Sequence, residues 1–533
     1  MKQLKTIRYT GMGIFLLGLL IFTITPFLGE IQVTDEIFKA NLSENEYANL
    51  KEPLAEISKQ TYNTGAGFGS DFKRVFNEVN ERLKANEEWG KVMWTPSSDT
   101  ALKLVMSANK GVVASNQLLF FLLTFGLCIL GSLVYILTDL KIKGPPGIKN
   151  DGIYHDSATN RGWVGMLAFG WLFFFYIILY FYPYIIADTI TLTQPIKSWF
   201  VEDEVPSKWF LYGLMYTVTM LVMGVRMIIK YRHNKYQIVR TITVVLFQLI
   251  FAFLLVEILP TFGLPGKDLK NAWPLDYQFL FDWNVQDLLA NGQFGKFVFV
   301  WGISLSVIVV PVMVYFYGKR WYCSWVCGCG GLAETLGDPY RQLSSKKMWS
   351  WKLERWMIHL VLVFAVLMTV FVGYHTWNVF QNPEMENKEI LFGFSAYDIR
   401  NYYSFLIGSV FAGVIGTGFY PILGNRAWCR FGCPLAAYMG IVQRFKSRFR
   451  ITTNGGQCIS CGNCSTYCEQ GIDVRAYAQK GQNIVRASCV GCGVCSAVCP
   501  RGVLKLENGP EDGRFGNEGP IVLGNQGFEL KDN

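Results

Sequence analysis

Charged residues are scarce in this chain. They make up 17% of its 533 residues, below the roughly 25% found in soluble domains. Hydrophobic residues reach 51% and aromatic residues 15%, and the charges that exist gather between long apolar runs. This composition excludes an ordinary soluble globular protein and predicts a chain that spans a membrane.

Histidine is rarer still, with four in the whole chain. His359 and His375 share one apolar run, but sixteen residues separate them, roughly 24 Å along a helix and on nearly opposite faces. His155 and His233 both lie in predicted loops. A haem between membrane helices needs paired histidines at matching depths, so we expect no haem.

Signals for several other classes of protein are also missing. The net charge of +9 comes without a basic groove interleaved with aromatic residues, so no nucleic-acid binding is expected. The segment NTGAGFGS (63–70) is rich in glycine, but no strand precedes it, and a flexible turn explains it better than a phosphate loop. With no nucleophile triad and no organic-cofactor motif, an enzyme with its own substrate pocket is the least supported interpretation.

Long apolar runs, in contrast, are abundant. Eight are long enough to cross a bilayer, which takes about 20 residues each. They lie near residues 10–28, 117–138, 163–187, 209–229, 241–260, 296–317, 357–379 and 404–423. A basic stretch precedes the first run, but no small-x-small cleavage site follows it, so we expect an uncleaved anchor rather than a signal peptide.

Lysine and arginine fall on alternate loops, which predicts the orientation of the chain. Loops such as KYRHNKYQIVR (230–240) are basic, whereas intervening loops such as PEMENKE (383–389) carry more acid. Both termini and everything after residue 424 are therefore expected in the cytoplasm, with the chain in the inner membrane of a bacterium. Residues 29–116, which contain no cysteine, are expected to form a helical segment on the outer side.

The chain has fourteen cysteines, and their placement indicates redox or metal chemistry. Cys128 lies in an apolar run and is expected to be a small packing residue. The other thirteen follow residue 320, on the predicted cytoplasmic side. Because thiols stay reduced in the cytoplasm, metal or redox sites are favoured over structural disulfides.

The strongest motif is a C-x2-C-x2-C-x3-C spacing that occurs twice near the C-terminus, the second time followed by Pro500. This is the ligand pattern of a bacterial ferredoxin with two [4Fe–4S] clusters, in which the fourth cysteine of each run binds the cluster of the other run. One cluster would be bound by Cys458, Cys461, Cys464 and Cys499, and the second by Cys468, Cys489, Cys492 and Cys495.

Two details qualify this motif. C-x2-C is also a zinc spacing, so a pair of structural zinc sites is the alternative, although eight cysteines in two identical runs favour clusters. Glu469 follows the first run where the second run has proline. Proline is not a ligand, so cluster binding need not be lost. A negative charge at this position is expected to lower the reduction potential of the nearer cluster.

A second repeat lies upstream, with the pattern G-x-R-x-aromatic-Cys-x-aromatic-x-Cys. It occurs in GKRWYCSWVCGCGG (318–331) and in GNRAWCRFGC (424–433), and each copy directly follows an apolar run. Both thiol pairs are therefore expected at the same edge of the membrane. Packing alone has no reason to repeat such a pattern.

These two segments supply four soft ligands, enough for an iron–sulfur cluster or one tetrahedral metal ion. Their arginines favour thiolates over thiols. A reversible dithiol pair, or cysteines that only fill a crowded interface, are the alternatives. The candidate ligands are Cys323, Cys327, Cys429 and Cys433, with Cys329 as a fifth thiol that has no counterpart in the second segment.

With these motifs the chain resembles the polyferredoxin-like membrane family that includes the NapH, NosR and CcoG proteins, and the NapH-like subgroup most. Members carry two C-x3-C-P segments after membrane helices and then a two-cluster ferredoxin domain; the resemblance covers roughly residues 241–505. One departure is that Gly328, not proline, follows Cys327. The resemblance implies electron transfer between a quinol or cytoplasmic donor and a redox partner, or a redox step in the maturation of a metalloenzyme.

The sequence thus predicts a membrane bundle of about eight helices with a C-terminal ferredoxin-like α+β domain. The leading hypothesis is electron transfer between that domain and a membrane quinone or a partner redox subunit. A maturation factor that reduces or delivers a metal, and a scaffold with structural or sensory clusters, are the alternatives. The expected parts are a membrane anchor (1–28), an extracytoplasmic segment (29–116), helices two to four (117–240), the region with two C-x3-C segments (241–450), the ferredoxin domain (451–505) and a flexible tail (506–533).

Overall fold

The computed structural model describes residues 2–143, 146, 156–202, 204–271, 273–382, 393–509, 521–524 and 527–530. The chain divides into two compact units. The smaller unit holds Met1–Lys143 and Phe174–Val218, and the larger unit holds Gly144–Phe173 and Thr219–Asn533. The predicted acidic loop at 383–389 and the histidine at position 155 lie outside the described residues.

Seven helices within the described residues are long and apolar enough to cross a membrane, which confirms a multi-pass membrane protein. Only 17–33% of the residues in their most apolar windows are buried inside the protein, so most of these side chains are left to face lipid. The seven are Lys2–Phe27, Gln117–Lys143, Trp163–Phe181, Lys208–Lys230, Lys235–Phe262, Gly292–Tyr317 and Met348–Gln381.

The eighth predicted span, near 404–423, is not one continuous α-helix. It is helical without interruption from Ala396 to Gly418, but its middle is π-helical, and the first residue outside the helix is Phe419. The stretch consists of α21 (Ala396–Tyr403), a π-helical segment η12 (Ser404–Ile415), and two short turns, α22 (Gly416–Gly418) and α23 (Tyr420–Leu423).

In the smaller unit, helix α1 (Lys2–Ile24) packs closely on α8 (Leu127–Lys143). Glycines permit this approach: a Cβ atom on Gly11 would lie 2.8 Å from the backbone nitrogen of Tyr135, and one on Gly131 would lie 2.4 Å from a backbone nitrogen of α1. Small residues at such contacts are typical of membrane helix pairs. The other elements found only in this unit's membrane region are η1 (Thr25–Phe27), α7 (Gln117–Phe121), η4 (Leu122–Gly126), η6 (Pro183–Ile186), α10 (Ala187–Thr191) and α11 (Gln194–Lys197).

Residues 29–116 are helical, and their glycine-rich stretch at 63–70 is the start of a helix rather than the predicted flexible turn. The Thr64 side chain caps this helix, and a Cβ atom on Gly69 would lie 2.1 Å from the Tyr184 ring, so glycine is needed for a close packing contact. The elements are α2 (Asp35–Asn41), α3 (Glu44–Leu54), η2 (Ile57–Lys59), α4 (Gly65–Ala85), η3 (Trp89–Lys91), α5 (Ser97–Ala108) and α6 (Val112–Ser115).

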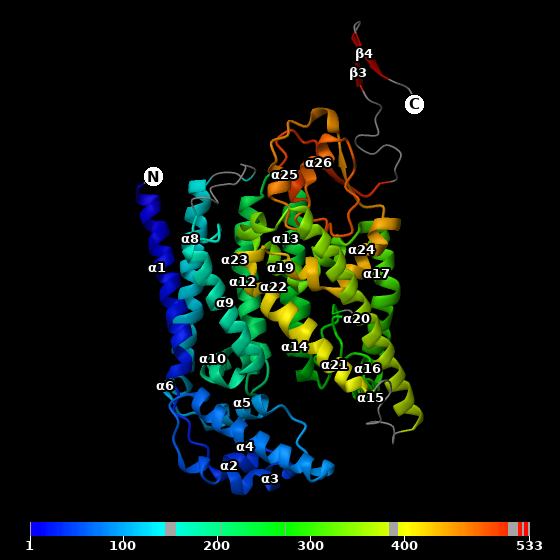
Figure 1. The fold of residues 1–533 in the computed structure, drawn as a ribbon. Helices are drawn as coiled ribbons and strands as arrows, with labels where there is room; N and C mark the ends of the chain where they lie inside the picture. Colours follow the sequence, from blue (N-terminus) through cyan, green and yellow to red (C-terminus); the bar gives the residue numbers. More distant parts are fainter. Residues whose placement is uncertain are drawn as a thin grey trace. The chain divides into compact units, whose positions relative to one another are not determined.

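The larger unit contains the helices that carry the thiol segments, and α9 (Trp163–Phe181) and α12 (Lys208–Lys230) contribute to both units. Figure 1 shows the long helices of the larger unit lying side by side. The elements are α13 (Lys235–Phe247), η7 (Gln248–Leu254), α14 (Leu255–Ile258), η8 (Leu259–Phe262), α15 (Asp282–Ala290), α16 (Gly292–Ser304), η9 (Leu305–Val309), α17 (Val310–Tyr317), α18 (Arg320–Cys323), α19 (Gly328–Glu334), η10 (Asp338–Leu343), α20 (Met348–Gln381), η13 (Trp428–Gly432) and α24 (Pro434–Lys446).

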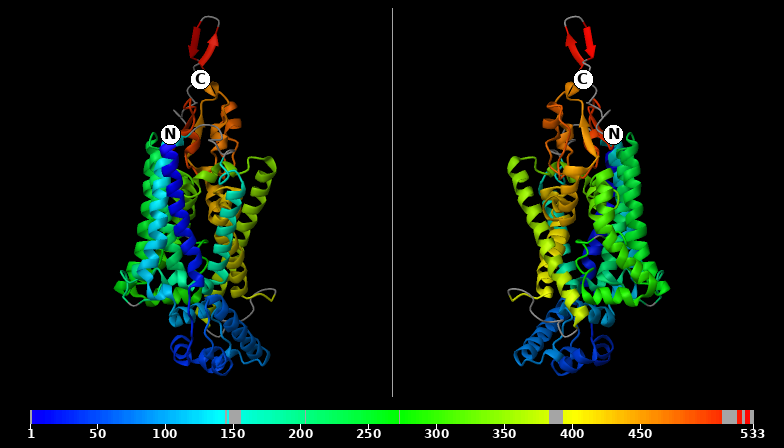
Figure 2. Two further views of the ribbon diagram at one scale, coloured as in Figure 1. Left: turned by 90° about the vertical axis from the view of Figure 1, so that its left-hand side faces the viewer. Right: turned by 90° about the vertical axis from the view of Figure 1, so that its right-hand side faces the viewer.

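A small α+β domain completes the larger unit and sits at one end of that unit's long helices (Figure 2). Its strands β1 (Arg450–Thr453) and β2 (Leu504–Glu507) are antiparallel, with Arg450 opposite Glu507. Between them lie η14 (Gly455–Gln457), α25 (Asn463–Thr466), α26 (Val474–Gln479) and α27 (Val494–Ala497). The predicted architecture, a membrane helical bundle followed by a small α+β domain, is confirmed.

Part of the predicted tail (506–533) has regular structure. Strand β2 extends to Glu507, and β3 (Ile521–Gly524) pairs with β4 (Gly527–Leu530) in an antiparallel hairpin.

Candidate functional site

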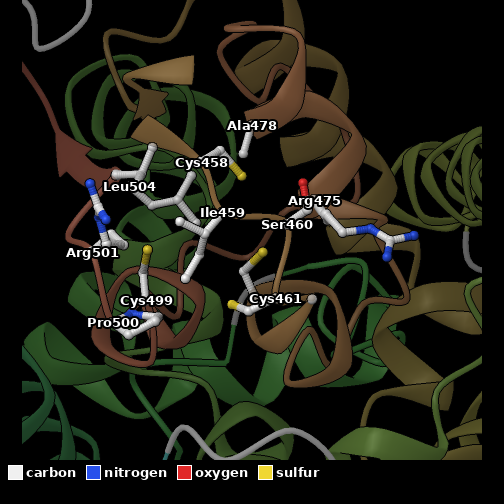
Figure 3. A pocket seen from close by; sticks show the side chains of 13 residues that line it. Cys458, Ile459, Ser460, Cys461, Arg475, Ala478, Cys499, Pro500, Arg501 and Leu504 are labelled. Atoms are coloured by element: carbon white, nitrogen blue, oxygen red, sulfur yellow. The ribbon is translucent and has the colours of Figure 1, made fainter. Parts of the chain in front are cut away.

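Two cavities in the α+β domain are each lined by four cysteines. The first is lined by Cys458, Cys461 and Cys464 together with Cys499, which belongs to the second cysteine run. Figure 3 shows the sulfur atoms of Cys458, Cys461 and Cys499 pointing into one shared space.

The second cavity has the reciprocal composition. Cys489, Cys492 and Cys495 line it together with Cys468 from the first run. The two cavities are alike in size, with about 360 and 390 Å³ of space free of protein atoms. The fold thus brings together the two sets of four that the spacing predicts; that each set binds a cluster stays a prediction.

Glycines in the left-handed region let the cysteine loops turn into short helices. Gly462, with φ 82°, precedes α25, and Gly493, with φ 70°, precedes α27 at the same position of the second run. Residues with a Cβ atom rarely adopt such angles. Each turn places the next cysteine, Cys464 or Cys495, in a buried position facing its cavity.

Burial holds some of the cavity thiols in the protonated form when no metal is bound. Burial raises the pKa of Cys464 to about 12 and that of Cys489 to about 11. Metals bind thiolates, so iron binding here would release protons and would be weakened in acid. Four thiols around each cavity fit an iron–sulfur cluster, whose ligands are cysteine thiolates.

The described residues contain no group of three His, Cys, Asp or Glu side chains that could hold a single metal ion. One tetrahedral zinc ion needs its sulfurs about 2.3 Å from a common point, whereas a cluster distributes its cysteines over several iron atoms.

The two cavities differ in the side chains that surround them. Exposed residues rim the first cavity, among them Ile459, Arg475 and Arg501, and Figure 3 shows both arginines at its edge. Around the second cavity, every lining residue other than the cysteines is buried. Exposed charge therefore lies beside the first cavity and not beside the second.

The second cysteine loop is attached to the membrane-side elements through its backbone carbonyls. Side chains from α13, α24 and the first thiol segment donate to successive carbonyls between residues 487 and 492. The hydrogen bonds are Lys319 Nζ to Ala487 O (2.9 Å), Gln443 Nε2 to Cys489 O (2.8 Å), Ser324 Oγ to Val490 O (3.0 Å), Tyr236 Oη to Gly491 O (3.0 Å), and both Gln237 Nε2 and Arg240 Nη1 to Cys492 O (2.8 Å each). The domain is thus held in place rather than tethered.

The two upstream thiol segments repeat in structure as they do in sequence. Gly318 and Gly424 both end the preceding helix with positive φ, 68° and 88°, and with extended ψ, −173° and 172°. The second cysteine of each segment is the N-cap residue of the next helix, Cys327 for α19 and Cys433 for α24. The repeated glycine is therefore explained by a turn that the chain makes twice.

The four predicted thiols of these segments come together. Cys323, Cys429 and Cys433 belong to one buried cluster, and Cys327 packs against it. A hydrogen bond from the Cys329 thiol lowers the pKa of Cys327 to about 6, although the Cys329 side chain is itself exposed. We call these five cysteines the thiol site. Whether it binds a cluster, a metal ion or neither stays a prediction.

A buried charge network lies beside the thiol site and the second cavity. Arg426 contacts Glu334 at 2.6 Å and Glu469 at 3.1 Å, and its Nη1 atom lies 3.6 Å from Cys429 Sγ. Glu469 directly follows Cys468, so one arginine connects the two sites. The remaining pairs are Arg240–Glu334 (2.8 Å), Arg341–Glu469 (2.8 Å), Arg341–Asp338 (2.8 Å), Arg226–Asp338 (2.6 Å) and Lys230–Asp338 (2.7 Å).

This network holds five cations and three carboxylates, an excess of two positive charges. Buried charges are stable only when they are compensated. Clusters ligated by thiolates are anionic, so the excess suits a cluster on either side of Arg426. The donor set and the surrounding charge thus fit the predicted iron–sulfur groups.

Glu469 corrects one expectation. Its negative charge was expected to lower the reduction potential of the nearer cluster, but Arg341 and Arg426 both bind it. Although burial alone would raise the pKa of Glu469, these arginines bring it below its ordinary value. The carboxylate is therefore ionised and already neutralised, and its effect on the potential is offset.

Sequence reasoning missed the carboxylates of the network. Glu334 and Asp338 are buried, yet they lie in GLAETLGDPYR, which resembles an ordinary cytoplasmic loop. Their position could have identified them. They directly follow the first thiol segment, and a charged residue at the predicted edge of the membrane needs a partner.

Gly330 gives a test of the geometry of the thiol site. A Cβ atom there would lie 1.9 Å from the backbone oxygen of Cys323, so Gly330→Ala must displace the first thiol segment. Overpacking of this kind costs about 1–3 kcal/mol, and we expect lower thermal stability together with a loss of metal bound at the thiol site. The measurement is the aggregation temperature and the metal content of the purified protein.

The matched control is Gly373→Ala in α20, where no atom lies within 4 Å of the added Cβ and alanine favours the helix. Equal stability and metal content in the two variants would contradict the described packing.

Comparison with known protein families agrees with this geometry. The family described as a 4Fe-4S dicluster domain matches residues 450–500. A second, described as a 4Fe-4S binding domain, matches residues 299–348 and 406–452, the stretches that carry the paired thiols. The chain therefore contains iron–sulfur binding domains, and the α+β domain is ferredoxin-like.

Several curated proteins are similar to part of this chain. YccM of Escherichia coli (strain K12), whose name describes an electron transport protein, is 26% identical over 199 residues, 36% of this chain and 52% of YccM. MauN of Methylobacillus flagellatus, a methylamine utilization ferredoxin-type protein, is 25% identical over 167 residues, 31% of this chain and 54% of MauN. NapH of Escherichia coli (strain K12), a ferredoxin-type protein, is 22% identical over 200 residues, 38% of this chain and 63% of NapH. The chain spans about half the length of the first two. No solved structure matches.

Proposed function

We propose that this chain transfers electrons across a series of iron–sulfur sites. The premise is that it is a relative of the polyferredoxin-like membrane proteins that include NapH. The two cavities would hold two [4Fe–4S] clusters, and the thiol site would hold a third redox group. The electrons would pass between a redox partner and either a membrane quinone or a second partner subunit. The same relatives, with names that describe electron transport and ferredoxin-type proteins, support this proposal.

One observation carries the proposal: the second cavity adjoins the thiol site. Cys492, which lines that cavity, packs against the buried cluster that contains Cys323, Cys429 and Cys433. An iron–sulfur cluster supplies one-electron transfer. The chain's own residues would hold the sites next to one another, with Arg426 placed between the second cavity and the thiol site.

The exposed rim of the first cavity is the place where a soluble or subunit partner would dock. Ile459 is 55% exposed there, and Arg475 and Arg501 add positive charge. An acidic surface on the partner would match this rim. The second cavity has the thiol site as its neighbour, because Val490, which lines that cavity, accepts a hydrogen bond from Ser324, the residue after Cys323.

The proposed location is the inner membrane of a bacterium, with both termini and the ferredoxin-like domain in the cytoplasm. The alternation of basic and acidic loops supports it. So does the chemistry of thirteen free cysteines, which a reducing compartment preserves.

The proposal is tested by Cys429→Ala, which removes one thiol of the thiol site and leaves both cavities complete. In proteoliposomes loaded with a quinone, we expect a chemically reduced ferredoxin-like domain to pass electrons on at least tenfold more slowly than in the unaltered protein. Cys128→Ala, which lies outside all three sites, is the control and is expected to change nothing. The measurement is quinone reduction by absorbance, with iron analysis of each sample.

Iron content near eight atoms per chain in Cys429→Ala would show that the two cavities are still filled. Unchanged quinone reduction in that sample would contradict electron transfer through the thiol site. A preparation of the unaltered protein that contains zinc but no iron would contradict the proposal as a whole.

Cys329 favours a second candidate, a maturation factor that reduces or delivers a metal ion. It is a fifth thiol beside Cys327, and it is exposed whereas Cys323, Cys429 and Cys433 are buried. A surplus accessible thiol is suited to taking up and releasing an ion. Deleting the protein separates the candidates: electron flow fails with an intact terminal enzyme in the first case, and the enzyme lacks its metal in the second.

A further inference from the structure

Helix α24 runs beside the last part of the membrane span that ends at Tyr317. Tyr438 Oη donates a hydrogen bond to Ser306 O, inside that span, at 3.5 Å. One and a half turns later, Gln443 Oε1 accepts a hydrogen bond of 2.6 Å from Lys319 N, just past the end of the span. Figure 1 shows α24 next to α17 on the side of the ferredoxin-like domain. The last turn of α24 therefore lies where this span leaves the membrane.

The outward side of this turn is apolar. Ile441 and Phe445, one helical turn apart, are 38% and 69% exposed. On α17, which packs against α24, Val312 and Phe316 are 48% and 43% exposed. Apolar side chains left uncovered at the edge of a membrane lie against the boundary between lipid headgroups and acyl chains.

Three basic side chains accompany this apolar surface, because Arg444, Lys446 and Arg448 are all exposed. The Arg448 guanidinium lies 5.4 Å from the centre of the Tyr315 ring and 5.6 Å from that of Phe316. Its Nε atom donates a hydrogen bond to Tyr315 Oη at 3.3 Å. Stacking on two rings of the span keeps this charge at the level of the membrane edge.

Arg444 is held in a similar way, since its guanidinium lies 5.6 Å from the centre of the Phe445 ring. The sequence supplies no acid close by: neither residues 292–317 nor residues 421–468 contain an aspartate or a glutamate. Positive charge above an exposed apolar surface matches a molecule with a negative headgroup and apolar chains. A soluble acidic protein would leave the apolar surface unmatched, and a neutral lipid would leave the charge unmatched.

The buried side of α24 contacts the two sites described above. Its N-cap residue is Cys433 of the thiol site. Gln443 donates hydrogen bonds from Nε2 to Arg486 O at 3.2 Å and to Cys489 O at 2.8 Å, in the second cysteine loop. Gln443 directly precedes Arg444. One turn of helix thus carries both the side chain that holds this loop and the charge at the membrane edge.

We propose that the last turns of α17 and α24 form a binding site for a phospholipid with an anionic headgroup. Its phosphate contacts the three basic side chains, and its acyl chains lie on the exposed rings of Phe316 and Phe445. The bound lipid braces the last turn of α24 and, through Gln443, the second cysteine loop. The proposal does not depend on which group the thiol site or the cavities hold.

The test is a titration of the purified full chain in detergent with dioleoyl phosphatidylglycerol, with bound lipid counted by native mass spectrometry. Dioleoyl phosphatidylcholine is the neutral comparison. We expect the unaltered protein to bind the anionic lipid more tightly, and Arg444→Gln with Arg448→Gln to weaken that binding about tenfold without changing the binding of the neutral lipid. Arg74→Gln with Arg82→Gln is the matched control, because it removes the same charge from exposed positions of α4, outside the membrane spans.

Equal affinity of the unaltered protein for the two lipids overturns the site, and so does a double variant at 444 and 448 that keeps its affinity for the anionic lipid. Glycerol phosphate has a phosphate group without acyl chains. If it displaced phosphatidylglycerol at equal concentration, the site would take a soluble anion and the proposal would be wrong.

Phe445→Ala tests the place of the acyl chains. Because this ring is 69% exposed, its removal should weaken binding of phosphatidylglycerol and leave the aggregation temperature in phosphatidylcholine unchanged. A lower aggregation temperature with unchanged lipid binding would show that the ring packs within the protein, and would overturn this placement.

Hydrogen exchange of the second cysteine loop tests the bracing of α24. Addition of phosphatidylglycerol should slow exchange of the backbone amides in residues 486–492 in the unaltered protein and not in the double variant at 444 and 448. Each comparison uses one preparation with and without lipid, so its iron content is the same in both samples. Unchanged exchange in the lipid-bound unaltered protein overturns the bracing.

Discussion

Replacing Cys499 with alanine is expected to remove about four iron atoms per chain and the paramagnetic signal of one cluster. The reason is geometric: Cys499 belongs to the second cysteine run, yet it lines the first cavity with Cys458, Cys461 and Cys464. We expect the cluster to be lost without one of its four thiolates. The measurement is iron and sulfide analysis with electron paramagnetic resonance on protein purified without oxygen.

Double variants decide which cluster was lost. If Cys499 and Cys458 serve one cluster, adding Cys458→Ala to Cys499→Ala removes no further iron, because ligands of one site are not additive. Adding Cys489→Ala should remove another four atoms or so. The reverse pattern would show that each run binds its own cluster and that the crossed assignment is wrong. Cys128→Ala, in a membrane helix of the smaller unit, is expected to keep all iron.

Arg426→Gln is expected to be the most destabilising single charge substitution in the chain. Arg426 is fully buried between Glu334 and Glu469, and its removal leaves both carboxylates without their shared cation. Breaking a buried ion pair by removing one partner costs about 3–5 kcal/mol. We expect a marked fall in the aggregation temperature of the detergent-solubilised protein and a loss of iron from the second cavity and the thiol site.

Two comparisons sharpen this prediction. Adding Glu469→Gln to Arg426→Gln removes one of the stranded carboxylates, so stability should partly recover. Arg74→Gln breaks an exposed pair with Glu78, whose side chains are 62% and 65% exposed, and solvent-screened pairs of this kind contribute little. If Arg426→Gln aggregated at the same temperature as Arg74→Gln, the network would not have the structural role that its burial indicates.

The cysteine sets could be predicted because cluster ligation depends on short sequence spacing. The four cysteines of each C-x2-C-x2-C-x3-C run lie close together in sequence. The glycines at 462 and 493, which turn each loop, lie within these runs. The repeat of the upstream thiol segments was also visible, since the same turn at Gly318 and Gly424 requires the same residue twice. Apolar runs likewise predicted seven of the helices that can cross the membrane.

The remainder depends on contacts between distant parts of the chain. Nothing near Lys270 in sequence indicates that its backbone oxygen accepts a hydrogen bond from Tyr322, and nothing near Glu334 indicates that Arg240 and Arg426 converge on it. The eighth span is helical from Ala396 to Gly418, but its middle is π-helical, a backbone distortion that an apolar run does not predict. Glu469 was judged by its own charge, whereas its effect depends on two arginines that lie 128 and 43 residues away in sequence.

The attachment of the ferredoxin-like domain has a consequence for how such chains can be recombined. The membrane side supplies the side chains, from Tyr236, Gln237, Arg240, Lys319 and Gln443, and the domain supplies peptide carbonyls between residues 487 and 492. Every residue type carries such a carbonyl, so the loop sequence is free to vary as long as its backbone path is kept. A ferredoxin domain from another protein would therefore match this part of the junction if it kept the same loop path, whereas the ion pairs of Glu469 with Arg341 and Arg426 also require a carboxylate at that position.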